Sequence, residues 1–210
     1  MMRPVLHVLT DPDLSRGRSH AEIATAALAG GADVVQLRDK HASLELFRES
    51  ARELRRLVSE AGRTFVVNDR LDVAIAVDAH GLHLGPLDGS VGEARGAWLP
   101  PRILGASARS LERARALAAA GADYLGVGPV FGTTTKRDAP GAIGLSTLRE
   151  IAAGVAVPVI AIGGIHAGNA ALAIEAGAAG VAVISAVVAA ADVEAAVAAL
   201  RRALDDAVSR

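Results

Sequence analysis

Cysteine is absent from the 210 residues, so disulfide bonds and thiolate metal sites are excluded. The six histidines form no HxH or HExxH pair, which argues against a zinc site. Aromatic side chains make up only 2% of the chain, whereas hydrophobic residues make up 51%. The core therefore has to be built from Ala, Val, Leu and Ile.

Strong charge of one sign is also missing. A formal net charge of -1 gives no overall attraction to nucleic acid or to an acidic membrane surface. The first stretch, "MMRPVLHVLTDPD", soon meets charge, so we expect neither a signal peptide nor a membrane anchor there. These absences predict a soluble cytoplasmic protein with no nucleic-acid or membrane partner.

The chain does contain a repeated alternation of short apolar strands and helical segments, at intervals of roughly 25 residues. The strands are almost continuously apolar, which is typical of a parallel sheet buried on both faces. Ser19 with Glu22, and Ser90 with Glu93, fit capping boxes at helix starts. We therefore predict a single (β/α)8 TIM barrel over residues 1–210. Its strands are expected at 5–10, 34–39, 64–69, 81–85, 103–108, 124–130, 158–164 and 180–186.

Active sites of such barrels form at the carboxyl ends of the strands, so the residues that close each strand are the candidates. The second predicted strand ends in "QLRDK", where Gln36, Arg38 and Lys40 alternate and so share one face. Two cations and an amide suit a polyanion such as pyrophosphate. An ion-paired strand end involving Asp39 is an equally good interpretation.

The next two strands end in carboxylates. Asn68 and Asp69 close the third strand. The same pair also begins many helices as a cap, and the pair taken alone favours this capping role. Asp88 follows the fourth strand, and with Asp69 it could hold Mg2+ beside phosphates. A surface aspartate in a turn is the commoner case. His83 lies within the fourth strand, where a core histidine is the ordinary interpretation and pocket lining the alternative.

The remaining strand ends carry hydroxyls, glycines and one more cation. Ser107 could donate to a ligand, while Ser110 is placed to cap a helix. Backbone N–H groups at the last two strands could bind phosphate, helped by a short helical turn near Ser185. The groups after strands six, seven and eight are Thr133, Thr135 and Lys136, then Gly163 and Gly164, then Ile184 and Ser185. An exposed polar loop and a simple chain turn are the alternatives.

Taken together, these strand ends resemble the thiamine-phosphate synthase family, also called thiamine-phosphate pyrophosphorylase. The resemblance covers nearly the whole chain, and the order and spacing of the motifs make it specific. The matching stretches are "VLTD", "VQLRDK", "VNDRLDVAIAV", "GLHLGPLD", "GADYLGVGPVFGTTTKRDAPGAIGL", "PVIAIGGI" and "VAVISA".

The resemblance implies that hydroxymethylpyrimidine diphosphate and thiazole phosphate condense to thiamine phosphate and pyrophosphate, with Mg2+ as cofactor. The residues implied to face the pyrimidine diphosphate are Gln36, Arg38, Lys40 and Asn68. Those implied to hold Mg2+ are Asp69 and Asp88, and those on the pyrophosphate are Ser107 and Lys136. Those at the thiazole phosphate are Thr133, Thr135, Gly164, Ile184 and Ser185.

The implied chemistry is loss of pyrophosphate from the pyrimidine methylene, leaving a carbocation that the aminopyrimidine ring stabilises. The protein would then neutralise charge on the leaving group, through Arg38, Lys40 and Lys136 with the metal. It would also hold the thiazole nitrogen in line with the cation. No nucleophilic side chain is required.

The chain departs from the family pattern at two positions. Pro86 stands where the family usually has Gln, and Arg109 stands where a histidine is typical. A sister family of thiazole tautomerases shares the barrel, but it generally lacks the paired acidic positions and the TxTK stretch and uses that histidine. A non-catalytic phosphate-binding protein would not need Asp69, Asp88 and Lys136 together.

The residues leave the oligomeric state open. The last helical segment, "DVEAAVAALRRALDDAV", could bury its apolar stripe on the barrel or on a second copy in a homodimer.

Overall fold

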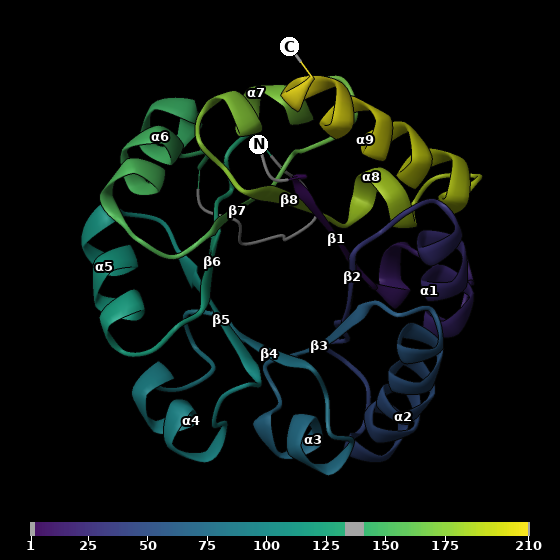
Figure 1. Ribbon diagram of the computed structural model, residues 1–210. Helices are drawn as coiled ribbons and strands as arrows, with labels where there is room; N and C mark the ends of the chain where they lie inside the picture. Colours follow the sequence, from purple (N-terminus) through teal and green to yellow (C-terminus); the bar gives the residue numbers. More distant parts are fainter. Residues whose placement is uncertain (1–2, 133–140, 210) are drawn as a thin grey trace.

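The computed structural model describes residues 3–132 and 141–209, in which eight parallel strands close into one barrel. The order of the strands around the barrel follows the sequence, and the last strand pairs with the first. Figure 1 shows the strands as an inner ring and the helices as an outer layer. The predicted (β/α)8 barrel is confirmed.

The strands begin where the sequence predicts, except that β7 begins one residue later, and most of them end sooner. They are β1 (Val5–Leu9), β2 (Val34–Leu37), β3 (Thr64–Asn68), β4 (Gly81–Leu84), β5 (Ile103–Ala108), β6 (Tyr124–Val127), β7 (Val159–Ile162) and β8 (Gly180–Val183). After β6, Pro129 has no N–H to donate to a ladder. After β7, Gly163 and Gly164 take positive φ values of 95° and 67°, which are outside the strand region. The predicted strand ends are thus the first residues of the loops.

The helices alternate with the strands. They are α1 (His20–Ala29), α2 (Leu44–Glu60), α3 (Leu71–Ala76), α4 (Val91–Ala97), α5 (Leu111–Ala119), α6 (Gly144–Gly154), α7 (Ala170–Glu175), α8 (Ser185–Val188) and α9 (Val193–Val208), with a 3-10 turn at Pro12–Leu14. Apolar residues at helical spacing explain how they pack. In α2, for example, Phe47, Ala51, Leu54 and Val58 form the buried stripe.

Three serines begin helices as predicted, although the capping box predicted at Ser90 is half formed. Ser19 forms a complete capping box with Glu22 at the start of α1. Ser90 accepts the Glu93 N–H at α4, and Ser110 caps α5 in the same way. The cap predicted from Asn68 and Asp69 is wrong, because α3 begins after Arg70 without a side-chain cap.

The barrel interior holds the polar rings. His7 on β1 and Tyr124 on β6 lie with ring centroids 5.5 Å apart, and His83 on β4 lies 5.4 Å from the same tyrosine ring. Because these strands are not neighbours, the contacts cross the barrel. A side chain at Gly105 would collide with the Tyr124 ring, so glycine is required there. Burial lowers the pKa of His7 to about 3, so this histidine is neutral.

Between barrel and helices the core is aliphatic, as the composition predicts, with Trp98, Phe47 and Phe65 among its largest buried side chains. Over the residues that the structure describes, no helix is long and apolar enough to cross a membrane. Closure of the barrel brings the carboxyl ends of all the strands to one face, here called the mouth. The opposite face is called the amino-end face.

Candidate active site

The end of β2 supplies two cations to the mouth. The Arg38 guanidinium is ion-paired with Asp11, and the Lys40 ammonium with Asp69. Gln36 is buried, and its Oε1 has no hydrogen-bond partner among the described residues. The ion-pair interpretation is therefore correct in kind, although Asp11 and Asp69, not Asp39, are the partners. A buried oxygen without a partner calls for one from outside these residues, and a ligand bound at the mouth would be such a partner.

Asp11 is a site residue that the sequence reasoning missed. It follows β1 by two positions, and only 4% of it is exposed. One carboxylate oxygen accepts the N–H of Asp13 at 3.1 Å, and the other faces Arg38. The carboxylate thereby fixes the direction of the guanidinium. The "VLTD" stretch was the available signal, because its aspartate closes a barrel strand.

The two predicted metal carboxylates lie together at the ends of β3 and β4. Asp69 takes a left-handed φ of 67°, and its N–H is bonded to the His83 carbonyl at 2.9 Å. Asp88 returns toward the strand, where its Oδ2 accepts the Gly85 N–H at 2.8 Å. Pro86 is the second residue of this turn, a position that proline suits. The proline therefore does not displace Asp88 from the mouth.

The two carboxyl groups interact with each other. Burial and a hydrogen bond with Asp88 raise the pKa of Asp69 to about 6, against the lowering effect of Lys40. Burial alone would raise the pKa of Asp88, but the bond from Asp69 and the charge of Lys40 outweigh burial and lower it. One proton is thus shared between the pair at mildly acidic pH, as expected for adjacent carboxylates near a single cation.

Ser107 lies at the end of β5 and is supported from inside the barrel. The Nε2 of His83 is 3.0 Å from the Ser107 Oγ, and its Nδ1 is 2.9 Å from the Tyr124 hydroxyl. His83 is 8% exposed, so the core interpretation of this histidine holds, and it also supports a residue of the mouth. Asn68, also 8% exposed, ends β3 nearby.

The ends of β7 and β8 provide turns with small residues. Gly164 packs against the Gly132 carbonyl and Phe131, so a side chain there would collide with them. Ile184 precedes the four-residue α8, whose first residue, Ser185, is exposed. The short helical turn predicted at Ser185 is therefore present. Thr133, Thr135 and Lys136 lie outside the described residues.

Arg109 follows β5, where the family pattern has histidine. Its Nη2 donates to the Gly141 carbonyl at 2.8 Å, on the segment that leads into α6. The guanidinium thus connects the β5 end to the start of the next helical unit. The sequence had left its position undecided.

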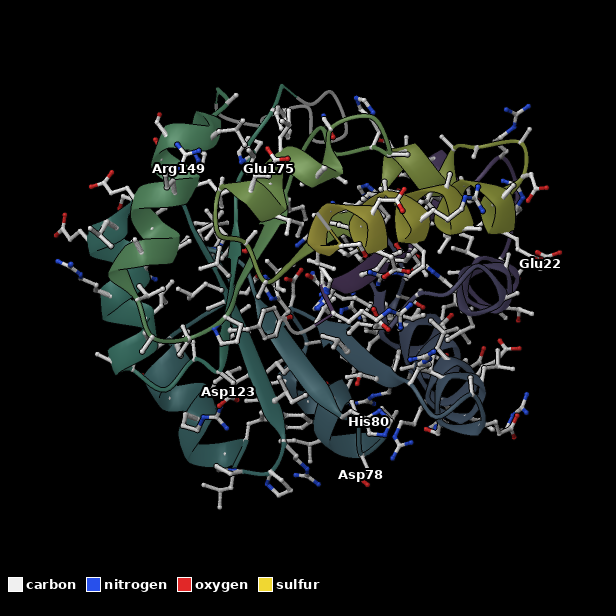
Figure 2. The ribbon with its side chains drawn as sticks, turned by 45° about the horizontal axis from the view of Figure 1, so that its top comes forward. Glu22, Asp78, His80, Asp123, Arg149 and Glu175 are labelled. Atoms are coloured by element: carbon white, nitrogen blue, oxygen red, sulfur yellow. The ribbon has the colours of Figure 1, made fainter. Side chains whose placement is uncertain are left out.

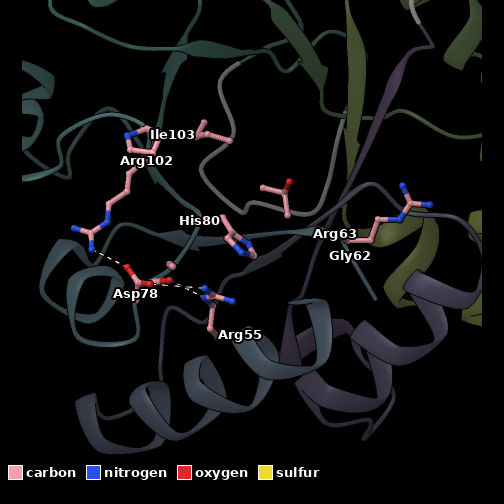
Figure 3. A pocket seen from close by; sticks show the side chains of 10 residues that line it. Arg55, Gly62, Arg63, Asp78, His80, Arg102 and Ile103 are labelled. Carbon is pink, nitrogen blue, oxygen red and sulfur yellow. Dashed lines mark hydrogen bonds and ion pairs between the residues drawn. The ribbon is translucent and has the colours of Figure 1, made fainter. Parts of the chain in front are cut away.

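A hollow of about 560 Å³ lies far from these groups, at the amino-end face. Figure 3 shows Arg102 and Arg55 directed toward Asp78, and Figure 2 places Asp78 and His80 together at this end. His80 Nδ1 accepts the Phe65 N–H at 2.9 Å. We assign this hollow a structural role, because these two arginines already have a carboxylate partner and because amino-end faces of such barrels serve stability.

Comparison with known proteins identifies the family. The model of a family described as thiamine monophosphate synthase matches residues 6–187. The chain belongs to this family. The match spans all eight strands, apart from the first residue of β1.

Curated relatives and a solved structure agree with the family match. A thiamine-phosphate synthase of Chloroflexus aurantiacus is 54% identical over 166 residues, covering 79% of this chain and 76% of the relative. One of Methanoculleus marisnigri is 51% identical, covering 79% of each chain. A solved thiamine phosphate pyrophosphorylase from Pyrococcus furiosus is 42% identical, with a TM-score of 0.89, covering 97% of this chain and 96% of that one.

Proposed function

We propose that this protein is a thiamine-phosphate synthase. It joins 4-amino-2-methyl-5-hydroxymethylpyrimidine diphosphate to 4-methyl-5-(2-phosphoethyl)thiazole and releases thiamine phosphate and pyrophosphate. The observation that carries the proposal is the cluster of Arg38, Lys40, Asp69 and Asp88 at the mouth. Cations next to paired carboxylates suit a metal-bound diphosphate. The family relationship supports the same reaction.

The donor set fits Mg2+. Asp69 and Asp88 offer oxygen ligands beside the Lys40 ammonium group, and burial together with the neighbouring Asp88 raises the pKa of Asp69. No group of three His, Cys, Asp or Glu side chains suited to a metal occurs among the described residues. Two carboxylates suffice for Mg2+, because it commonly keeps waters and takes further ligands from substrate phosphates. When bound, Mg2+ would help to neutralise the charge on the leaving pyrophosphate.

The side chains at the β2 end bind and orient the diphosphate in this proposal. Arg38, held in direction by Asp11, can fork two phosphate oxygens, and Lys40 adds a point charge. Ser107 donates its hydroxyl, oriented by His83, to the same group. The Gln36 Oε1, which has no hydrogen-bond partner among the described residues, suits the amino group of the pyrimidine, and Asn68 is assigned to the same substrate. Arg38, Lys40 and Ser107, with Lys136, act where charge develops.

The thiazole phosphate is assigned to the ends of β7 and β8. Gly164, Ile184 and Ser185 would bind it largely through backbone N–H groups, with Thr133 and Thr135 beside them. Departure of pyrophosphate leaves the pyrimidine methylene as a carbocation, which the thiazole nitrogen attacks. Holding the two rings in line can supply up to about 7–11 kcal/mol in favourable cases.

The test is pyrophosphate release by the purified protein with both substrates and Mg2+. Release should require both substrates, and Asp88→Ala should lower it by about 100-fold or more, since one metal ligand is lost. The matched control is Asp72→Ala, because Asp72 is an exposed carboxylate on α3 whose one ion pair among the described residues is with Arg48. Its rate should equal that of the wild type.

Two outcomes would contradict the proposal at different levels. No release from folded wild-type protein would overturn the synthase assignment and favour a phosphate-binding protein. Release with an unaffected Asp88→Ala variant would retain the enzyme and remove Asp88 from the metal site. The homodimer, the cytoplasmic location and the single domain over residues 1–210 stay predictions of the sequence.

A further inference from the structure

A histidine outside the proposed substrate contacts lies between two strand ends of the mouth. His20 is the first residue of α1, and its Nδ1 is 2.8 Å from the Thr10 Oγ1, just after β1. Its Nε2 is 3.3 Å from the Asp39 Oδ2, just after β2. The side chains of His20 and Asp39 are 13% and 11% exposed, and Thr10 is fully buried. The imidazole therefore bridges β1 and the β2–α2 loop.

Both ends of this bridge hold the backbone of the proposed diphosphate-binding residues. Thr10 Oγ1 accepts the backbone N–H of Arg38 at 3.2 Å. Asp39 Oδ1 accepts the backbone N–H groups of His41 and Ala42, each at 2.9 Å. The bridge therefore fixes the chain at Arg38 and on both sides of Lys40.

One hydrogen-bond assignment satisfies every group of the bridge. The Thr10 hydroxyl donates to His20 Nδ1, and the Nε2–H of His20 donates to Asp39. The Thr10 oxygen still accepts from Arg38. The other acceptor available to the hydroxyl, the Gln36 carbonyl, is 3.5 Å away and makes a poor hydrogen bond.

The position of His20 is itself fixed by the start of α1. Ser19 accepts the Glu22 N–H at 3.2 Å, and Glu22 accepts the Ser19 N–H at 2.7 Å. This capping box sets where the helix begins and hence where the ring at its first position points. A ring anchored to a rigid helix can fix the distance between the two loops that it contacts. Neither loop could fix that distance by itself.

We propose that His20 is a positioning residue that sets the spacing between Arg38 and Lys40, and thereby the affinity for the pyrophosphate group. The inference rests on the proposed function, in which these two cations bind the diphosphate. Binding of one small anion by a bidentate guanidinium and an ammonium group depends on the distance between the two cations, because both must contact its oxygens. Removal of the imidazole leaves both cations present and lets the distance between them vary.

The test compares His20→Ala with wild type in two measurements. Calorimetric titration with magnesium pyrophosphate should show affinity weaker by about tenfold, the scale expected when an orienting group is lost. Steady-state kinetics should show a similar rise in KM for the pyrimidine diphosphate, with KM for the thiazole phosphate unchanged. A Thr10 pair gives a second route, in which Thr10→Val repeats the defect and Thr10→Ser retains wild-type affinity.

The matched control is His80→Ala at the amino-end face. This variant also removes an imidazole that bonds to a neighbouring group, here the Phe65 N–H, so it lowers stability in a comparable way. Its pyrophosphate affinity should equal that of the wild type. An equal loss of affinity in His80→Ala and His20→Ala, or wild-type affinity in folded His20→Ala and Thr10→Val, would overturn the proposal.

The two measurements also separate this proposal from the proposed function. Wild-type protein that binds magnesium pyrophosphate without turnover would fail as a synthase, while the binding defect of His20→Ala would still support the positioning role. Wild-type protein that does not bind magnesium pyrophosphate would overturn the positioning role as well. If His20→Ala does not fold, the Thr10 pair decides.

Discussion

Buried charged groups are paired differently at the mouth and at the amino-end face of the barrel. At the amino-end face, Arg201 is buried and forms ion pairs with Asp33 and Asp205, although its Nε has no hydrogen-bond partner among the described residues. Asp33 also binds Arg3 and Arg63. At the mouth, two carboxylates crowd around one lysine, and the Gln36 Oε1 has no partner within the described part of the chain. Charges matched within the protein stabilise a fold, whereas incompletely matched groups in a concave mouth indicate a ligand.

Two arginines make this comparison testable. Arg38 at the mouth and Arg201 at the amino-end face have side chains that are 11% and 8% exposed. Each pairs with an aspartate next to a strand: Asp11 follows β1, and Asp33 precedes β2. They are therefore similar in burial and in partner, and they differ mainly in the face of the barrel that they occupy.

The largest effect is expected for Arg38→Met. Loss of one positioned donor should lower kcat/KM by about 10²–10³-fold. It should also cost about 3–5 kcal/mol in the free energy of unfolding, because Asp11 keeps a buried charge without its partner. Steady-state kinetics and urea denaturation measure the two losses separately.

A second substitution separates stability from activity at this position. In Arg38→Met with Asp11→Asn, the buried charge is gone, so most of the lost stability should return while the activity stays low. Recovery of activity in the double variant would show that Arg38 acts only by neutralising Asp11.

The next effect is expected for Arg201→Met at the other face. Its Nη1 donates to the Pro4 carbonyl at 2.8 Å and to Asp33 at 3.1 Å, so removing it should cost about 3 kcal/mol of stability. At a temperature where the variant is folded, kcat/KM should equal that of the wild type. A fall in kcat/KM comparable to that of Arg38→Met would remove the distinction between the two faces.

The sequence predicted the fold well because barrel strands and helices have local signals. Strand starts follow apolar runs, and Ser19, Ser90 and Ser110 cap helices through contacts within four residues. The rule that barrel sites lie at strand ends then brought Gln36, Arg38, Asp69 and Asp88 to one mouth. That part of the site could be predicted without side-chain positions.

Side-chain partners could not be predicted in the same way. The Asn68-Asp69 pair taken alone favours a helix cap, but the left-handed backbone of Asp69 and its contact with Lys40 place it at the mouth. The partner of Lys40 lies 29 residues away, and the partner of Arg38 lies 27 residues away. His20 carried no motif, since its contacts depend on where α1 begins relative to two strands. Such pairings are set by packing.

The smallest effect concerns the crowded carboxylates. The pKa of Asp69 is about 6 in the folded protein, above its ordinary value of 3.8, so the folded state binds more protons between these values. Ionisation of Asp69 therefore costs stability as pH rises from about 4 to 6, while the lowered pKa of Asp88 acts in the opposite direction. Asp69→Asn keeps a residue that tolerates a positive φ and removes this titration. Urea denaturation without divalent cations should show the variant gaining stability relative to wild type as pH rises through this window. A difference that stays flat, or falls, would mean that burial and the neighbouring Asp88 do not raise the pKa of Asp69, and the contrast between the two faces would lose its clearest sign.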